Sequence, residues 1–437
     1  MSMGDQAQKL QTDVAVVGSG PGGATVAREL ARQGKKVVIL ERGNNPKWTG
    51  NLFSTFFIMD KRSLLFPKGS VRVGRALTTG GSSSIYCGTA VPPPDWIKAK
   101  YKIDLGEFVE EARREIGIKP LPERLIGPAS QRIMKAARDL GFNWNPMDKF
   151  IDPEKCELKC PHCMLGCDKG AIWTARKSVQ EAVKSGAVLI NQALVQEILV
   201  ENKQATGVTA RTPKGQLTVE AKVTVLAAGG MATPVLLQGA GMSNSGQGLF
   251  VDPLIITYGN CKGFSSGRDI PMTAGTLEFA SEGIVMTDLA YPWAFYLLNA
   301  YWKGWKYVPK ILGYGSTIGI MTKVRDGLSG QVGPDGTVSK PIADEDRQKL
   351  DKGAGIAEKI LKQAGADPQS IYTSPVGAAH PGGTVRIGQG VNTDLETPMA
   401  NLYVCDTSII PEPLGLPPVW TIIAFGKRLA RRLGSVV

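Results

Sequence analysis

The sequence predicts an α/β protein whose main domain is Rossmann-like, with a second α+β region inserted into it. Two observations carry this expectation. A complete strand–helix–strand unit occupies residues 13–41 near the start of the chain. Buried strand patterns followed by helical stretches recur at 223–238 and 401–433, where they return the chain to the same sheet. The composition agrees, because 43% hydrophobic and 21% charged residues are typical of a globular protein.

The first unit begins with an apolar run at 13–18, which we interpret as a buried parallel strand. A helical stretch follows over 24–33, and residues 36–41 form a second buried strand. This length is typical of a βαβ unit.

The turn between this strand and helix carries a Gly-x-Gly-x-x-Gly motif. Gly18 suits the tight turn, Gly20 lets the backbone approach a pyrophosphate, and Gly23 lets helix and strand pack closely. Glu41 ends the second strand, where an acid can bind ribose hydroxyls. The combination predicts a dinucleotide site, and the acid at 41 disfavours the 2′-phosphate of NADP.

The middle of the chain alternates between helical and strand patterns. Helices are expected over 103–118 and 129–140, and short strands over 192–200 and 206–211. We therefore expect a discontinuous nucleotide domain and a substrate or cap domain. The nucleotide domain comprises 1–95, 155–250 and 375–437, and the cap domain comprises 96–154 and 251–374.

The chain has a formal net charge of +12, which favours phosphate-bearing cofactors, anionic membrane surfaces or acidic proteins as partners. Nucleic acid is not expected, because no run of lysine and arginine is long enough to form a basic arm. Residues 1–12 contain no apolar signal segment, so we expect a cytoplasmic protein, with attachment to the inner membrane surface as an alternative.

Four of the seven cysteines lie within twelve residues. They are Cys156, Cys160, Cys163 and Cys167. In a reducing compartment such a cluster indicates a metal or redox centre. A [4Fe–4S] cluster uses four thiolates, a [3Fe–4S] form would use three of them, and zinc is the alternative. His162 lies inside this loop and would be placed to hydrogen-bond a cluster sulfide.

Residues 291–307 are rich in aromatic side chains, and no charged residue occurs from Leu289 to Trp302. The stretch is too short to span a bilayer. Aromatic residues beside lysines suit a membrane interface or a partner-docking surface over 289–310, and a substrate-pocket wall is the alternative.

Five blocks of the sequence, in order along the chain, resemble the glucose–methanol–choline (GMC) oxidoreductases. The blocks are Gly18–Gly23 with Glu41–Gly43, Gly80–Ser82, Leu226–Pro234, His380–Gly388 and Asn401–Ser408. The resemblance implies FAD as cofactor, in a domain of the type also found in p-hydroxybenzoate hydroxylase. Residues 250–372 match the family only weakly, so the substrate is not implied.

By resemblance, Gly18, Gly20, Gly23 and Glu41 hold the ADP half of FAD. Gly81 and Ser82 lie along the flavin, Val195 binds the adenine side, and Asp406 lies at the pyrophosphate. The amino end of the helix near Thr421 faces the flavin, where its dipole stabilises negative charge. The remaining members of the expected cofactor-binding set are Arg42, Gly80, Ala228, Gly229 and Pro418.

His380 corresponds to the catalytic histidine of the family, and an imidazole is suited to act as a general base near neutral pH. Two positions depart from the family. Pro417 stands where a second histidine or asparagine is usual, and Tyr86 replaces an asparagine, which would place a catalytic phenol near the flavin.

These features predict an FAD-dependent dehydrogenase that oxidises an alcohol or polyol to a carbonyl. Electrons would leave through an iron–sulfur cluster to a protein or quinone acceptor rather than to oxygen. The alternatives are a flavin-dependent C–C desaturase, reductase or isomerase, and an electron-transfer subunit without a small-molecule substrate.

Overall fold

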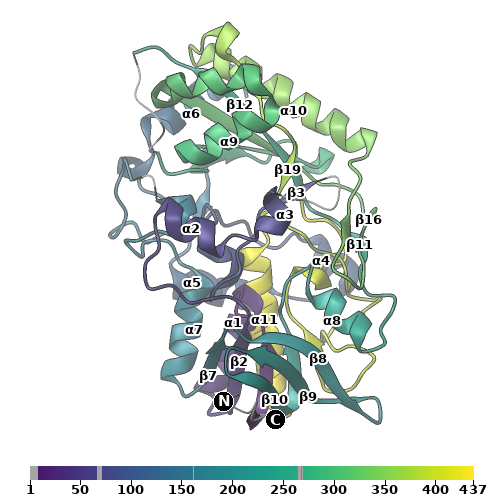
Figure 1. The fold of residues 1–437 in the computed structure, drawn as a ribbon. Helices are drawn as coiled ribbons and strands as arrows, with labels where there is room; N and C mark the ends of the chain where they lie inside the picture. Colours follow the sequence, from purple (N-terminus) through teal and green to yellow (C-terminus); the bar gives the residue numbers. More distant parts are fainter. Residues whose placement is uncertain (1–7, 66–70, 161, 264–266, 268) are drawn as a thin grey trace, which may run out of the picture.

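The computed structural model describes the chain except for residues 1–7, 66–70, 161, 264–266 and 268. Two sheets lie toward opposite ends of the molecule, and α2 (Leu52–Ile58) and α3 (Lys61–Leu65) lie between them (Figure 1). The last helix, α11 (Val419–Gly434), runs down to the first sheet (Figure 1).

The first sheet confirms the predicted α/β fold. Its order is β7-β2-β1-β10-β9-β8, and β20 pairs with the last residues of β10. Five strands are parallel: β1 (Gln8–Val17), β2 (Val37–Glu41), β7 (Val188–Asn191), β10 (Gly215–Leu226) and β20 (Leu402–Val404). Antiparallel β8 (Leu194–Glu201) and β9 (Gln204–Thr212) complete the sheet. The expected strand–helix–strand unit is present.

Helix α1 (Pro21–Arg32) packs against α7 (Ala175–Lys184) and α11 (Val419–Gly434) beside this sheet. Helix α1 begins three residues before its predicted start, because Pro21 occupies its first turn, where a proline costs no hydrogen bond. At the junction with α11, the buried Lys427 ammonium lies within 3.2 Å of the carboxylates of Glu29, Glu111 and Glu115.

Residues 96–118 pack against this first core, although the predicted division assigns them to the cap domain. They contain α4 (Trp96–Tyr101) and α5 (Gly106–Ile116). Phe108 and Ala112 of α5 are buried in the same hydrophobic cluster as the strands of the first sheet, and the Trp420 indole donates to the Val109 carbonyl at 3.2 Å. The apolar face of α5 is covered by α11, which no local sequence pattern encodes.

The second sheet has the order β3-β19-β12-β15-β14-β13-β5, with β18 also paired to β12. Its long strands are β12 (Pro253–Asn260), β14 (Ile284–Asp288) and β15 (Thr317–Val324). The short strands are β3 (Arg72–Val73), β5 (Asn145–Pro146), β13 (Ala274–Thr276), β18 (Tyr372–Thr373) and β19 (Gly377–Ala378). Helices α6 (Pro128–Asp139) and α10 (Asp344–Gln363) bury their apolar faces against it.

The remaining elements are short. The helices are α2 (Leu52–Ile58), α3 (Lys61–Leu65), α8 (Thr233–Gly239) and α9 (Trp293–Lys303), and 3-10 turns include Gly81–Ser84, Cys163–Leu165 and Trp305–Ser316. The strands are β4 (Lys119–Pro120), β6 (Asp148–Lys149), β11 (Gln247–Leu249), β16 (Gly330–Val332) and β17 (Val338–Ser339). In the part of the chain that the structure describes, no helix has the length and apolar character needed to cross a bilayer.

Candidate active site

The nucleotide end of the site is built where β1 passes into α1. Gly18 has a φ of +102°, and a side chain there would meet the Ala227 carbonyl oxygen at 2.3 Å. Gly20 precedes α1, and no atom lies within 4 Å of the place a side chain would take. Open space beside the amino end of a helix suits a phosphate. Gly23 packs against Gly18 and Val16, as expected for close contact of helix and strand.

The carboxylate of Glu41 is buried at the end of β2. It accepts from the Ser19 hydroxyl at 2.6 Å, the Ser19 amide at 3.2 Å and the Gly43 amide at 2.7 Å. These bonds hold the first glycine turn against the loop after β2. The neighbouring Arg42 is exposed.

A second glycine loop lies directly against the first. The Gly80 amide donates to the Ser19 hydroxyl at 3.0 Å, and a side chain at Gly81 would meet the Gly20 Cα at 3.1 Å. The Ser82 hydroxyl accepts from the Ala76 amide at 3.2 Å. Gly80 and Gly81 have φ values of +93° and +56°, so a larger residue at either position would strain the backbone as well as crowd its neighbours.

The buried carboxylate of Asp406 connects the loops that follow β10 and β20. It accepts from the Gly229 amide at 2.8 Å, the Thr233 hydroxyl at 2.5 Å and the Ser408 amide at 2.8 Å. Burial raises its pKa, and these hydrogen bonds act in the opposite direction. The Thr233 hydroxyl also accepts from the Ala228 amide at 3.2 Å. Asp406 therefore organises the loop rather than offering a free carboxylate.

The other expected flavin-site positions belong to β8 and α11. Val195 is buried in β8. Pro418 immediately precedes α11, and Thr421 is buried in the first turn of that helix. Apart from Val195 in antiparallel β8 and the loop at 80–84, the expected nucleotide-site residues come from the carboxyl ends of parallel strands and the helix starts beside them, as in open α/β sheets that bind ligands.

His380 lies in a buried polar cluster with two residues that the sequence analysis did not select. Its Nδ1 is 3.1 Å from Asp252 Oδ2 and 3.3 Å from Lys323 Nζ. The Asp252 and Lys323 side chains are buried, whereas the His380 side chain is 22% exposed. We assign the Nδ1 proton to the shorter contact, with the Asp252 carboxylate as acceptor, which leaves Nε2 with a free lone pair.

Burial and the Lys323 charge lower the pKa of His380, and Asp252 raises it. The net direction is downward, so the imidazole is neutral near pH 7. Burial also lowers the pKa of Lys323 to about 8, against the attraction of Asp252. The lysine therefore remains mostly protonated at neutral pH.

Asp252 also connects His380 to the loop before α11. Its Oδ1 accepts from the Gly415 amide at 3.1 Å, next to the loop that carries Pro417. Asp252 has a φ of +48°, and the Asp326 carboxylate accepts its amide at 3.0 Å. Lys323 could have been selected from the sequence, because it is the single charged residue at 317–324. The structure shows that all eight residues of this strand are buried.

The four clustered cysteines occupy a loop between β6 and α7. Cys163 is buried, and Cys156, Cys160 and Cys167 are half-buried. Cys156, Cys163 and Cys167 belong to one apolar cluster with residues including Ile172, and the Cys167 sulfur accepts from the Ile172 amide at 3.4 Å. Burial raises the pKa of the Cys156 thiol to about 11 and that of Cys163 further.

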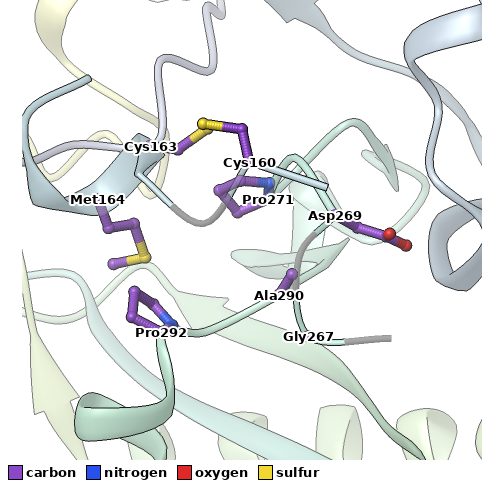
Figure 2. Close-up of a pocket in the computed structure, with 8 residues that line it drawn as sticks. All are labelled: Cys160, Cys163, Met164, Gly267, Asp269, Pro271, Ala290 and Pro292. Carbon is purple, nitrogen blue, oxygen red and sulfur yellow. The ribbon is translucent and has the colours of Figure 1, made fainter. Parts of the chain in front are cut away.

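Cys160 and Cys163 line a small cavity with Met164 and Pro292, and their side chains point toward one another in Figure 2. Among the described residues, a different group brings its candidate ligand atoms closest together. The ligand atoms of Cys160, His162 and Asp168 all lie within 4.8 Å of one another. The His162 Nδ1 contacts Asp168 Oδ1 at 2.9 Å.

Tyr86 lies beside the cysteine loop. Its hydroxyl donates to the Trp173 carbonyl at 2.6 Å, and burial together with nearby thiols raises its pKa well above the usual value. The phenol is therefore held by the backbone, which does not favour the expected role in proton transfer. Cys87 follows Tyr86 in the chain, and its carbonyl accepts a hydrogen bond from the buried Lys149 ammonium at 2.7 Å. Residues 80–87 thus form one segment that begins at the contact of Gly80 with Ser19 and ends beside the cysteine loop.

The match to family models decides the family. Residues 68–254 and 338–426 match the two GMC oxidoreductase models, and residues 11–50 match an FAD binding domain. The chain belongs to the GMC oxidoreductase family. It is therefore an FAD-dependent oxidoreductase.

Relatives of this GMC protein extend over nearly all of its length. An uncharacterized protein of Methanocaldococcus jannaschii is 31% identical, with 96% of this chain and 99% of that protein covered. A long-chain-alcohol oxidase of Arabidopsis thaliana is 26% identical, with coverage of 98% and 67%. A formate oxidase of Aspergillus oryzae has a TM-score of 0.76 at 15% identity, covering 98% of this chain and 99% of the other, and shares the fold.

FAD suits the arrangement of this GMC protein. The open space at Gly20, the free amide groups at the start of α1 and the buried Glu41 at the end of β2 are what an ADP group requires. Gly229 has a φ of +88°, and no atom lies within 4 Å of the place a side chain would take.

Proposed function

We propose that this protein oxidises an alcohol or polyol to a carbonyl compound and passes the electrons to an acceptor other than oxygen. The observation that carries the first part is the buried cluster of His380, Asp252 and Lys323. When bound, FAD would accept the hydride of the carbinol C–H bond at its N5 position, so that the alcohol is oxidised as the flavin is reduced.

In this proposal His380 removes the hydroxyl proton through Nε2. Asp252 holds Nδ1–H and stabilises the imidazolium that forms. Lys323 keeps the resting imidazole neutral and compensates the Asp252 charge. The buried pair thus supplies polar groups near a site where Pro417 has no side-chain donor or acceptor.

The cofactor roles inferred for the other residues remain part of the proposal. Gly18, Gly20, Gly23 and Glu41 would hold the ADP half, with the Gly80–Ser82 loop along the flavin. The start of α11 would stabilise negative charge on the flavin ring.

We further propose that Cys156, Cys160, Cys163 and Cys167 hold an iron–sulfur cluster. Such a cluster would carry electrons singly to a protein or quinone acceptor. The raised thiol pKa values mean that the cysteines would release protons when metal binds, as metal thiolate sites do. The packing of three of these cysteines around Ile172, beside Tyr86, supports a centre at this loop.

A second candidate is an alcohol oxidase with a structural zinc site. The proximity of Cys160, His162 and Asp168 favours it, because zinc accepts mixed sulfur, nitrogen and oxygen ligands. Oxygen would then be the acceptor, and the four-cysteine centre would carry no electrons.

The test is an anaerobic absorption spectrum with iron, acid-labile sulfide and zinc assays. About four irons per chain beside flavin bands would support the electron path, and about three would favour the smaller cluster. One zinc per chain without iron would reject this electron path and support the oxidase proposal. Aliphatic alcohols and polyols should then bleach the flavin anaerobically.

Substitution of the base separates chemistry from cofactor binding. His380→Ala should abolish bleaching while the protein retains FAD. Failure of every alcohol to bleach the wild-type flavin would reject alcohol oxidation and favour a C–C reaction or an electron-transfer subunit.

A further inference from the structure

In the part of the chain that the structure describes, the exposed aromatic side chains gather in two short segments. Among the described residues, all seven exposed tryptophan, tyrosine and phenylalanine side chains lie either at 48–57 or at 293–305. In the first segment Trp48 is 83% and Phe53 74% exposed, and in the second Trp305 is 77% exposed. Soluble proteins rarely gather so many exposed aromatics without an interaction that covers them.

These two segments adjoin the cysteine loop from different sides. The Thr55 hydroxyl of α2 donates to the Leu165 carbonyl at 3.0 Å, and the Gly50 amide donates to the same carbonyl at 2.9 Å. On the other side, Met164 lines one cavity with Pro292, the residue before α9, and points toward it (Figure 2). Helices α2 and α9 lie on the same side of the molecule in Figure 1. We call segments 48–57 and 293–312 together the aromatic face.

Helix α9 is apolar but only partly covered by the rest of the molecule. Only Tyr296 and Ala300 of its eleven residues are buried. They pack toward β12, where the Tyr296 ring lies 4.9 Å from that of Tyr258. On this helix Trp293, Tyr301 and Lys303 are exposed, and Leu312 beyond it is 90% exposed, so these side chains are available for contact.

The charges of the aromatic face have one sign. Residues 43–59 and 289–325 contain no acidic residue, whereas Lys47, Lys303 and Lys306 are exposed. In the intervening cysteine loop, Asp152, Glu154 and Glu157 are paired with Lys155, Arg124 and Lys169, and Asp168 contacts His162, which carries a positive charge only when protonated. The face therefore combines apolar aromatics with an excess of positive charge.

We propose that the aromatic face binds the surface of an anionic lipid bilayer. Tryptophan and tyrosine suit the headgroup level, phenylalanine and leucine enter the acyl boundary, and lysines pair with lipid phosphates. A second copy of the chain is a poor occupant, because a symmetric interface would bring the same lysines together.

The consequence of membrane binding for electron transfer rests on the proposed function, whereas the test of membrane binding does not depend on it. A cluster at the cysteine loop would lie at the bilayer surface, where it would deliver electrons to a lipid-soluble quinone. Lipid binding requires no substrate, metal or turnover, so its failure would leave the proposed redox chemistry untouched.

The experiment is co-sedimentation of the full-length, FAD-loaded protein with phosphatidylcholine vesicles that contain or lack phosphatidylglycerol. We expect binding to the anionic vesicles, weakened by salt. Phe53→Ser with Phe57→Ser, and Trp305→Ser with Leu312→Ser, should each reduce binding by about tenfold or more, because each pair removes apolar area. The matched control is Val188→Ser with Leu194→Ser, exposed apolar residues at the first sheet, which should not change it.

Circular dichroism and FAD content establish that each variant is folded. The proposal is overturned if no vesicle is bound, or if the aromatic variants bind as well as the control. It is also overturned if light scattering shows self-association that the aromatic variants lose, since the face would then join two copies of the chain.

Discussion

Asp252 holds the His380 ring in place by a direct contact with Nδ1. It accepts from the ring at 3.1 Å, and its second oxygen is bonded to the loop before α11. It therefore determines both the tautomer and the position of the proposed base. An acid in this position also stabilises the positive charge that the ring acquires when it takes a proton.

Asp252→Asn should lower kcat by about a hundredfold or more, because the amide cannot stabilise the imidazolium. FAD content should be unchanged. The matched control is Asp288→Asn, another buried carboxylate, whose pKa is raised to about 6 by burial. Asp288 accepts from the Ala274 amide in the second sheet, and its substitution should leave kcat within a few fold. Equal losses in both variants would contradict the role of Asp252.

Lys323→Met should shift the acid limb of the kcat/KM profile. The wild-type profile should rise with pH through the lowered pKa of His380, since only the neutral ring accepts a proton. Removal of the neighbouring positive charge leaves Asp252 to act alone, which raises the His380 pKa. The acid limb should therefore move to higher pH, toward or above the ordinary value of 6.5. An unchanged profile would show that Lys323 does not influence the base.

At the scale of elements, substitutions at Gly20 and Gly22 distinguish the packing of α1 from its role in the nucleotide site. A side chain at Gly22 would lie 1.8 Å from the Cys405 carbonyl oxygen, so Gly22→Ala must separate α1 from the end of β20. We expect a loss of about 3 kcal/mol or more in the free energy of unfolding. Chemical denaturation of the FAD-free protein measures it.

Gly20→Ala should leave stability nearly unchanged but weaken FAD binding. The position has a φ of −67° and open space, so the FAD-free protein should unfold within about 0.5 kcal/mol of wild type. The added methyl group occupies the space into which the phosphates would fit, and FAD should bind more weakly in a fluorescence titration. Undiminished FAD affinity would move the pyrophosphate away from α1.

The sequence was most informative where one local pattern determines an element. The period of the apolar residues and the glycine spacing predicted β1, α1 and β2, and the family resemblance around residue 380 selected His380 as a candidate base. Asp252 and Lys323 were missed because their proximity depends on the pairing of β12 with β15, in which Leu254 lies opposite Lys323. The two-residue strands β3 and β19 and the packing of α5 on α11 likewise depend on distant partners.

At the scale of the whole molecule, the proposed flavin contacts come from segments that are far apart in the chain. They include α1, the loop at 80–84, the loop after β10 and the start of α11. Ligand that binds only the folded state stabilises it by mass action, by about 4 kcal/mol at a free concentration a thousand times the dissociation constant.

Removal of FAD should therefore lower the unfolding temperature, and added FAD should restore it in a concentration-dependent way. Differential scanning fluorimetry at several FAD concentrations measures this. An FAD-free protein with an unchanged transition would indicate that the cofactor does not connect these segments.

The late position of β20 and α11 in the sequence sets the order in which the nucleotide domain is completed. During translation, β10 and α1 cannot pack against β20 and α11 until residues 402–434 have been synthesised. A nascent chain that stops short of these residues therefore exposes the apolar face of α1, where chaperones would bind it. FAD loading would follow synthesis of α11, and a truncation before residue 402 would remove the nucleotide site as effectively as one near residue 18.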